Sequence, residues 1–377
     1  MARENAIIDD FLEDLAYLSD EENTISSDEE DKRASKKIRM CKLVPFYQTR
    51  NDIFGYFSED RIMKTFRFDR DSIQFILGLI QHLLPKMKIR DTRNLEPIDM
   101  LLIALQFYAT GSFQTVVGNV LRYSQSSVCR SIARVSLALC MISNNHIQFP
   151  ATLFQVKKDF HEIARMPGVV GCIDGTHIRI VRPKNHEKAY VNRKNYHSLN
   201  VQAICDANHR FLSVCANKPG SCHDSSIFKG SLVYKRFING EFKEGFLLGD
   251  SGYANTNFLI TPYAEPVTQP EIRFNNSHKS TRCTIERSFG LLKKRFYVLH
   301  SEIRMSPTKA SWITVACCLL HNIAIDRKMP LDEDSIDLDI DNVDNTVSNN
   351  KNQNKSDNDL RQLGTAKRRR ITENVFS

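Results

Sequence analysis

The chain has 377 residues, of which 41% are hydrophobic and 25% charged, and its formal net charge is +8. This length fits two domains or one large domain, and no apolar run approaches the roughly 20 residues of a membrane span. The first residues lack the basic and apolar regions of a signal peptide, and the ten cysteines include no Cys-x-x-Cys pair. We therefore expect an intracellular protein with reduced thiols, no structural zinc site and no membrane partner.

The charge is unevenly distributed along the sequence. Residues 1–31 carry a net charge of −11 and residues 331–360 carry −7, whereas residues 361–377 carry +4. The central part of the chain, residues 32–330, therefore holds +22. A globular region with this charge suits a polyanion such as DNA. The alternative is a basic protein whose charge serves no partner.

The chain begins with an acidic, serine-rich segment, residues 1–45, which we expect to be disordered. Its one apolar stretch, Ile7–Leu15, has helical spacing and is either a solvated tail or a docking segment. The end of the segment is basic, at residues 32–39.

Residues 46–150 form a second region, in which apolar residues recur at helical intervals. Two short helices are predicted near its end, separated by a break that closes with Ser124, a good N-cap for Gln125–Val135. This spacing is typical of a helix-turn-helix, whose second helix reads bases in the major groove. Arg130 and Arg134 lie four positions apart, hence on one helical face, and are candidate DNA contacts. The alternative is a helical hairpin that only packs on the next domain.

Residues 165–326 are predicted to form an α/β domain, because strand-length apolar runs alternate there with helical patterns. Buried strands are predicted at Val169–Ile173 and Gly245–Gly249, and a hairpin at Asn200–Asp206 and Phe211–Ala216. Helices are predicted over 224–237, over about 282–298, and from a Ser306 cap with proline at the first helical position to about 325.

The chain ends in residues 327–377, which we expect to be a second disordered tail because residues 331–360 are rich in Asn and Asp. The tail contains the basic cluster Lys367–Arg370. This cluster and residues 32–39 resemble nuclear localisation signals, so we expect the nucleus, and also the cytoplasm, as locations. The alternative is that either cluster binds nucleic acid directly.

Three carboxylates occupy positions that suit a metal-dependent nuclease. Asp174 and Asp250 each follow an apolar run of strand length and have a glycine within two residues, and Glu286 lies in a segment with helical spacing. Hard divalent cations prefer oxygen ligands, and such cations activate water and stabilise the leaving oxygen of a phosphodiester. The alternatives are ordinary turn residues for the two aspartates, and a surface glutamate that pairs with Arg282 or Arg287.

These stretches and their flanks resemble the transposases of PIF/Harbinger-type DNA transposons and, among them, the harbinger transposase-derived nuclease of animals. The resemblance extends from about Ile98 to Ile325, and Glu286 follows Asp250 by 36 positions, as that family's pattern requires. Further shared motifs are Tyr190–Lys194, His197–Asn200, Pro219–Ser221, His223–Asp224 and Cys317–Asn322.

The resemblance implies a ribonuclease H-like α/β fold, a mixed sheet with flanking helices, preceded by the all-helical region. It implies that Asp174, Asp250 and Glu286 are catalytic residues and ligands of two Mg²⁺ or Mn²⁺ ions, with Asp174 bridging them. It also implies a separate Myb/trihelix-like DNA-binding protein as a partner. We therefore expect a metal-dependent nuclease that hydrolyses DNA phosphodiester bonds, or alternatively a non-catalytic DNA-binding or scaffold protein that retains the fold.

Five basic residues near these motifs are candidate DNA contacts. Arg193 and Lys194 lie in one of the shared motifs, and either can bind a phosphate. Lys293, Lys294 and Arg295 follow the predicted catalytic glutamate on the same helix and can hold phosphates near the metals. The alternative for these three is a solvated helix face.

Two polar residues beside the motifs have a structural and a functional interpretation. His177 follows Asp174 closely and is expected to be a hydrogen-bonded scaffold residue, with a contact to substrate or metal as the alternative. Asp224 is expected to be the N-cap of a helix, with a role as a fourth site carboxylate as the alternative.

Overall fold

The computed structural model describes residues 53–85, 95–330 and 355–377. The chain divides into two units, Met1–Phe57 and Ser58–Ser377. Of the first unit, the structure describes only the end, with the short helix α3 (Ile53–Tyr56). The expectations for residues 1–45, including the basic residues 32–39, and for residues 331–354 lie outside the described residues. The helical region from Ser58 onward and the α/β domain belong to one unit.

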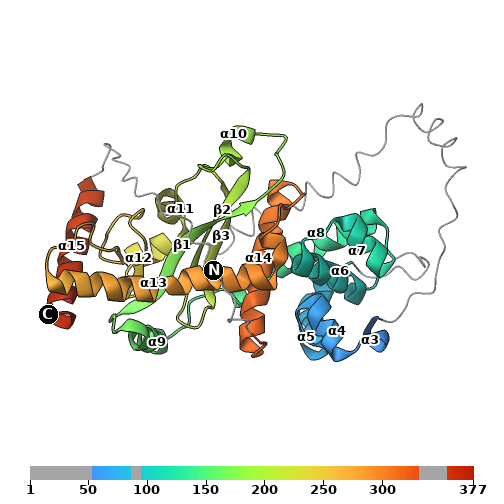
Figure 1. The fold of residues 1–377 in the computed structure, drawn as a ribbon, viewed down its shortest axis with the longest axis horizontal. Helices are drawn as coiled ribbons and strands as arrows, with labels where there is room; N and C mark the ends of the chain where they lie inside the picture. Colours follow the sequence, from blue (N-terminus) through green and yellow to red (C-terminus); the bar gives the residue numbers. More distant parts are fainter. Residues whose placement is uncertain (1–52, 86–94, 331–354) are drawn as a thin grey trace, which may run out of the picture. The chain divides into compact units, whose positions relative to one another are not determined.

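The first part of the second unit is helical, as predicted (Figure 1). Its centre is α6, which is buried on all sides over Met100–Ala109 and packs against α8, where the Tyr108 and Ser136 hydroxyls lie 2.6 Å apart. The Ser124 side chain accepts a hydrogen bond from the Ser127 N–H and so caps α8, as its sequence position predicted. The helices are α4 (Glu59–Phe66), α5 (Arg70–Ile80), α6 (Pro97–Thr110), α7 (Gln114–Leu121) and α8 (Gln125–Met141).

A mixed five-stranded sheet forms the centre of the α/β part, with the order β3-β2-β1-β4-β5. Strand β2 is antiparallel to β1 and β3, whereas β4 is parallel to β1 and β5. This arrangement, with helices flanking the sheet, confirms the predicted ribonuclease H-like fold. The strands are β1 (Val169–Arg179), β2 (Ser198–Cys205), β3 (Phe211–Pro219), β4 (Phe246–Leu248) and β5 (Leu259–Ile260).

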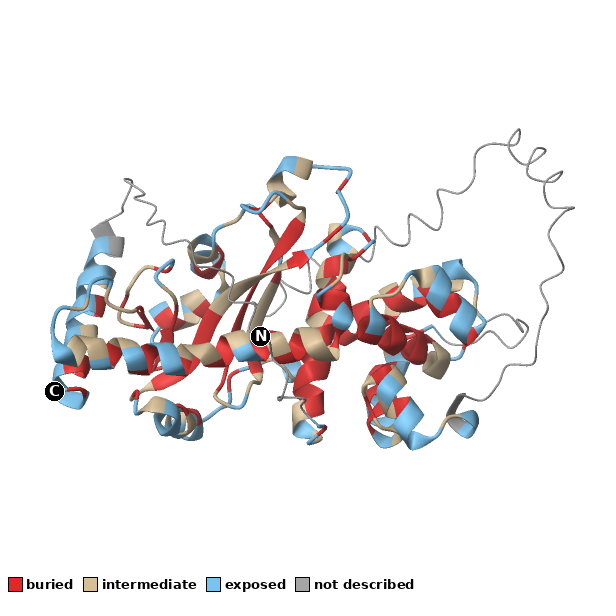
Figure 2. Ribbon diagram, viewed as in Figure 1, coloured by how far each residue is buried: buried red, intermediate tan, exposed pale blue. Residues whose placement is uncertain are grey.

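Helices cover the sheet, and alternate residues of β1 show which helix contacts which face. The Cys172 thiol donates to the Thr281 carbonyl of α13, whereas Ile173 joins an apolar cluster with Phe228 of α11 and Val233 of α12. Figure 2 shows buried residues concentrated in the strands and in α6 and α14. The helices are α9 (Phe154–Ala164), α10 (Glu187–Tyr190), α11 (Asp224–Gly230), α12 (Leu232–Ile238), α13 (Gln269–Arg295), α14 (Pro307–Asp326) and α15 (Lys355–Val375).

Two predicted helix boundaries were wrong. The helix predicted over 224–237 is two helices, because the Ser231 hydroxyl accepts from the Tyr234 N–H and starts α12 afresh. Helix α13 begins at Gln269 rather than near residue 282, because Thr268 and Glu271 form a reciprocal capping box. Its 27 residues give one continuous helix that crosses the sheet (Figure 1).

Helix α14 is long and apolar enough to cross a membrane, contrary to the expectation that no apolar run approaches that length. It has 20 residues, Pro307–Asp326, and contains an 18-residue stretch with a mean hydropathy of 1.2, but 78% of that stretch is buried inside the protein. It contacts α8 and β3. Burial against other elements explains its apolar composition.

The C-terminal helix α15 corrects the expectation of a disordered tail over residues 355–377. Ile371 and Phe376 are buried, and the Phe376 ring packs edge-on against Phe274 of α13. Gly364 lies so close to the Thr256 backbone that a Cβ there would come within about 2.6 Å of it. The apolar residues of this segment therefore pack a docked helix and do not lie in a solvated tail.

Candidate active site

Asp174 and Asp250 come from the neighbouring strands β1 and β4. The sequence placed Asp174 at the end of a strand. In the structure it lies within β1, because β1 continues to Arg179. Strand β4 pairs with β1 only as far as Cys172, so Asp250, two residues after β4, lies in the loop that follows this pairing. Local hydrogen bonds orient both side chains: the Gly175 N–H donates to Asp174 Oδ1 at 2.8 Å, and the Gly252 N–H donates to Asp250 Oδ1 at 3.1 Å.

Helix α13 brings Glu286 to Asp174 through Arg282. Arg282 Nη1 donates to Asp174 Oδ2 at 3.0 Å, and Nη2 donates to Glu286 Oε1, one turn along the helix, at 2.5 Å. The Arg282 side chain is only 14% exposed. The charge of Asp250 also acts on Arg282, so two of the three predicted carboxylates contact one guanidinium and the third acts on it through its charge. The pairing of Glu286 with Arg282, given above as the alternative to a site role, is therefore part of the same cluster.

Asp224 is a fourth carboxylate of this cluster, so its predicted role as an N-cap is wrong. The N-cap of α11 is His223, and Asp224 is the first helical residue. Asp224 Oδ1 instead accepts from Asn200 Nδ2 at 2.7 Å and lies against Gly175, where any side chain would overlap its carboxylate. One feature of the sequence could have indicated this role of Asp224. The strand predicted over 200–206 contains polar residues such as Asn200, and a buried amide needs a hydrogen-bond partner.

Burial and mutual repulsion raise the pKa of the clustered carboxylates. Burial, together with the charges of Asp250 and Asp224, raises the pKa of Asp174 to about 7, against the opposing effects of Arg282 and the Gly175 N–H. Burial also raises the pKa of Asp250, as does the charge of Glu286. Burial dominates the raised pKa of Asp224 too, although its hydrogen bond from Asn200 opposes it. A cluster with this excess of negative charge is stabilised by a cation.

The donor set fits a divalent cation, although the side chains are not arranged around one. In the described ranges, no three His, Cys, Asp or Glu side chains form a ready metal-binding group. Arg282 lies between Asp174 and Glu286 and makes the contacts that a cation would make. The oxygen-only set of Asp174, Asp224, Asp250 and Glu286 is the kind that Mg²⁺ and Mn²⁺ prefer, so these residues would hold such an ion.

The basic residues predicted to contact DNA are placed differently from one another. Lys293 Nζ donates to Thr176 Oγ1 at 2.9 Å, two residues along β1 from Asp174 and on the same face. Arg193 Nη2 lies 2.8 Å from His223 Nδ1, beside Asp224. Arg295, in contrast, donates from Nη2 to the Pro330 carbonyl at 2.9 Å, and is bound to the main chain.

The other predicted basic residues include Lys194, which is exposed, and Lys294, which is half-buried on α13. On α8, Arg130 is exposed and Arg134 is half-buried. Their DNA-binding role stays a prediction.

His177 is a hydrogen-bonded scaffold residue, as expected. Its Nδ1 lies 3.0 Å from the Ser198 hydroxyl, which also accepts from Asn192 Nδ2 at 3.1 Å. The main-chain N–H groups of Lys194 and Tyr196 donate to Asn192 Oδ1. The polar residues of this shared motif therefore shape the loop between β1 and β2.

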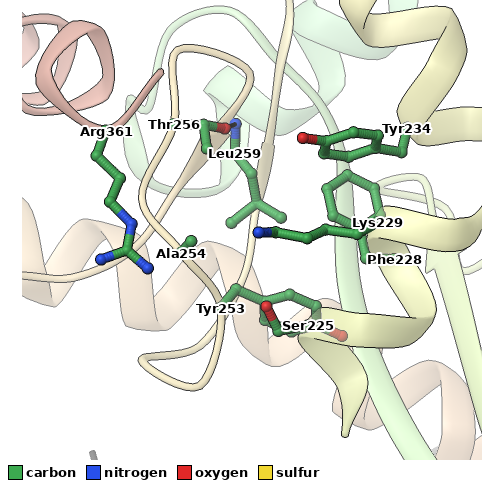
Figure 3. A pocket seen from close by; sticks show the side chains of 9 residues that line it. All are labelled: Ser225, Phe228, Lys229, Tyr234, Tyr253, Ala254, Thr256, Leu259 and Arg361. Carbon is green, nitrogen blue, oxygen red and sulfur yellow. Dashed lines mark hydrogen bonds between the residues drawn. The ribbon is translucent and has the colours of Figure 1, made fainter. Parts of the chain in front are cut away.

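A small cavity lies between α11, α12, the loop after Asp250 and α15 (Figure 3). Its volume of about 20 Å³ is sufficient for roughly one water molecule and excludes a nucleotide base. The cavity is lined by Ser225, Phe228, Lys229, Tyr234, Tyr253, Ala254, Thr256, Leu259 and Arg361.

Known proteins resemble this chain over most of its length. Residues 173–322 match a family described as DDE superfamily endonuclease. The human protein named "Putative nuclease HARBI1" is 36% identical over 278 residues, covering 72% of this chain and 79% of that protein. The Xenopus laevis protein of the same name is 31% identical, with coverages of 74% and 82%. "Protein ALP1-like" of Arabidopsis thaliana is 27% identical over 300 residues, 73% of each chain. No solved structure matches significantly.

Proposed function

Since the chain belongs to the family of Harbinger transposase-derived nucleases, with an endonuclease domain of the DDE superfamily, we propose that it hydrolyses phosphodiester bonds in DNA. The observation that carries this proposal is that Asp174 and Glu286 share the guanidinium of Arg282, while Asp250 and Asp224 lie near enough for their charges to act on Asp174. Asp174, Asp250 and Glu286 would hold Mg²⁺ or Mn²⁺ ions. Bound there, such ions supply an activated water and stabilise the leaving oxygen.

The side chains around the carboxylates have separate tasks in this proposal. The Gly175 N–H orients Asp174, and Asn200 holds Asp224 against the glycine. Lys293, anchored at Thr176 on the same face of β1, is suited to hold a DNA phosphate next to the reacting one. These positions are set by rigid elements, a strand and a long helix, which hold reacting groups within narrow limits.

DNA binding is proposed to use the basic surface beyond the site. Arg193 and Lys194 near β2, Lys294 on α13, and Arg130 with Arg134 on α8 are the candidate contacts, and the high positive charge of the chain's centre supports them. Arg295 is left out because it donates to main-chain carbonyls.

A Myb/trihelix-like protein is proposed as the partner that supplies sequence-specific DNA binding. The proposed locations are the nucleus and the cytoplasm. Of the two basic clusters that suggest nuclear import, Lys367–Arg370 is partly engaged in the fold, because Lys367 and Arg368 donate to main-chain carbonyls. Residues 32–39 are therefore the better candidate.

Nicking of supercoiled plasmid DNA by the purified chain tests the proposal. The wild type should nick with Mg²⁺ or Mn²⁺ and not with EDTA, and Asp174→Ala should lose more than about 100-fold in rate, since even residues behind metal ligands cost 10–100-fold. Asp71→Ala, at an exposed position of α5, should leave the rate unchanged. DNA binding without nicking under any of these conditions would favour the alternative, a non-catalytic DNA-binding or scaffold protein.

A further inference from the structure

One cation of the protein itself lies inside the carboxylate cluster. The guanidinium of Arg282 donates to Asp174 on β1 and to Glu286 on its own helix, at 3.0 and 2.5 Å, and only 14% of the side chain is exposed. Two carboxylates that come from different elements are thus held together by one side chain. Arg287, five positions further along the same helix, is exposed.

A guanidinium and a divalent cation cannot occupy this position together. Mg²⁺ binds oxygen ligands at about 2.0–2.1 Å, and two such oxygens, Asp174 Oδ2 and Glu286 Oε1, now accept hydrogen bonds from Arg282. An ion bound to both oxygens would lie within a few ångströms of the guanidinium. Like charges at such a separation repel strongly in a partly buried site.

We propose that Arg282 is a positioning residue that holds the cluster together in the metal-free protein and is displaced when a divalent cation binds. The inference rests on the proposed metal-dependent function and adds a step to it. An ion bound to Asp174 Oδ2 and Glu286 Oε1 would replace Arg282 in two ion pairs, so the ion and the Arg282 guanidinium compete. Removing the guanidinium should therefore increase the affinity for the ion, whereas removing a residue that merely supports the fold should decrease it or leave it unchanged.

The test is Mn²⁺ binding to the full chain, measured by isothermal titration and by the electron paramagnetic resonance signal of free Mn²⁺. Arg282→Gln retains a side-chain N–H donor but carries no charge. It should bind Mn²⁺ at least about tenfold more tightly than the wild type, which is within the usual range of coupling between two ligands. Arg287→Gln removes the same charge from the exposed face of α13 and should match the wild type. Adding Asp174→Asn to Arg282→Gln should abolish the gain.

Thermal unfolding gives a second readout that does not depend on activity. In EDTA, Arg282→Gln should melt at a lower temperature than the wild type, because Asp174 and Glu286 lose their ion-pair partner and Asp250 loses a nearby positive charge. Mn²⁺ should raise its melting temperature more than that of the wild type, in proportion to the tighter binding.

Two results would overturn the inference in distinguishable ways. If the wild type binds Mn²⁺ and Arg282→Gln binds it no more tightly, Arg282 does not compete with the ion, and the proposed nuclease function is unaffected. If neither protein binds Mn²⁺, the competition fails together with the metal-dependent function, and the plasmid assay should then show no nicking.

Discussion

Helices α13 and α15 are both long and rich in basic residues, yet their cations have different acceptors. On α13, Arg282 and Lys293 donate to side chains of β1, at the carboxylate cluster and beside it. On α15, Lys367 donates to the carbonyls of Glu244 and Asn257, and Arg368 to those of Thr261 and Pro262. The first set belongs to the site, and the second set fastens the C-terminal helix to the segment before β4 and to the loops on either side of β5.

The difference shows that a basic residue's role depends on what accepts its hydrogen bonds. In the sequence, Lys367–Arg370 is a compact cluster and predicts an accessible signal, whereas Arg282 and Lys293 are eleven positions apart. The structure does not support the prediction of a fully accessible cluster. Lys367 and Arg368 are half-buried, whereas Arg369 is exposed, so only part of the cluster faces the solvent.

The largest expected effect concerns the carboxylates that Arg282 serves. Because the folded pKa of Asp174, about 7, exceeds its ordinary value of 3.8, the folded state binds its proton more tightly than the unfolded state does. Stability therefore falls as pH rises from about 4 to about 7. Asp174→Asn cannot lose this proton, so in EDTA its free energy of unfolding relative to the wild type should rise by up to about 3 kcal/mol between pH 5 and pH 8. Urea unfolding at both pH values measures this, and a mutant whose stability relative to the wild type does not rise between pH 5 and pH 8 contradicts it.

The α15 side of the comparison predicts a smaller loss of stability. Replacing Lys367 and Arg368 together by Met removes the charged donors to four carbonyls. One buried hydrogen bond to a charged group contributes about 1.5–3 kcal/mol. Because both side chains are half-buried and water can replace part of these bonds, we expect a total loss of about that size in the free energy of unfolding, measured in urea. Arg369→Met breaks only an exposed pair with Glu373 and should cost less than about 0.5 kcal/mol. Equal effects of the two changes would mean that α15 contributes no anchored contacts.

The glycine beside Asp174 tests how tightly the cluster is packed. Gly175→Ala places a methyl group where the Asp224 carboxylate lies, and overpacking of this kind costs about 1–3 kcal/mol. The same variant should bind Mn²⁺ more weakly. Gly78→Ala, on α5 with open space around it, should be neutral or stabilising by about 0.5–1 kcal/mol. A Gly175→Ala protein with unchanged stability and Mn²⁺ affinity would show that Asp224 need not lie there.

The smallest expected effect on stability concerns a third basic helix. Replacing Arg130 and Arg134 of α8 by Ala should weaken DNA binding and reduce its dependence on salt, since each phosphate contact contributes about one unit to the slope. Stability should change by no more than about 0.5 kcal/mol. Exposed Lys158 and Lys243, replaced together, remove the same charge elsewhere. Binding that falls equally in both double mutants would assign the effect to net charge and not to α8.

Local sequence was sufficient to predict much of the fold. Apolar runs of strand length located β1, β2, β3 and β4, because the period of two along a strand is a local property. Ser124 and Ser306 located the starts of α8 and α14, since capping needs only the next few residues. The split at Ser231 and the early start of α13 were missed, because the same residue types also occur in loops.

The sequence by itself determined the ribonuclease H-like sheet and which three carboxylates, Asp174, Asp250 and Glu286, to examine. Only the tertiary structure decided that Asp224 joins them and that Arg282 lies among them. The physical reason is the distance along the chain: Arg282 and Asp174 are 108 positions apart, and no local pattern reports which strand a helix will cover. An aspartate at the start of a helix has the same sequence signature whether it caps that helix or, like Asp224, packs against the glycine beside another carboxylate.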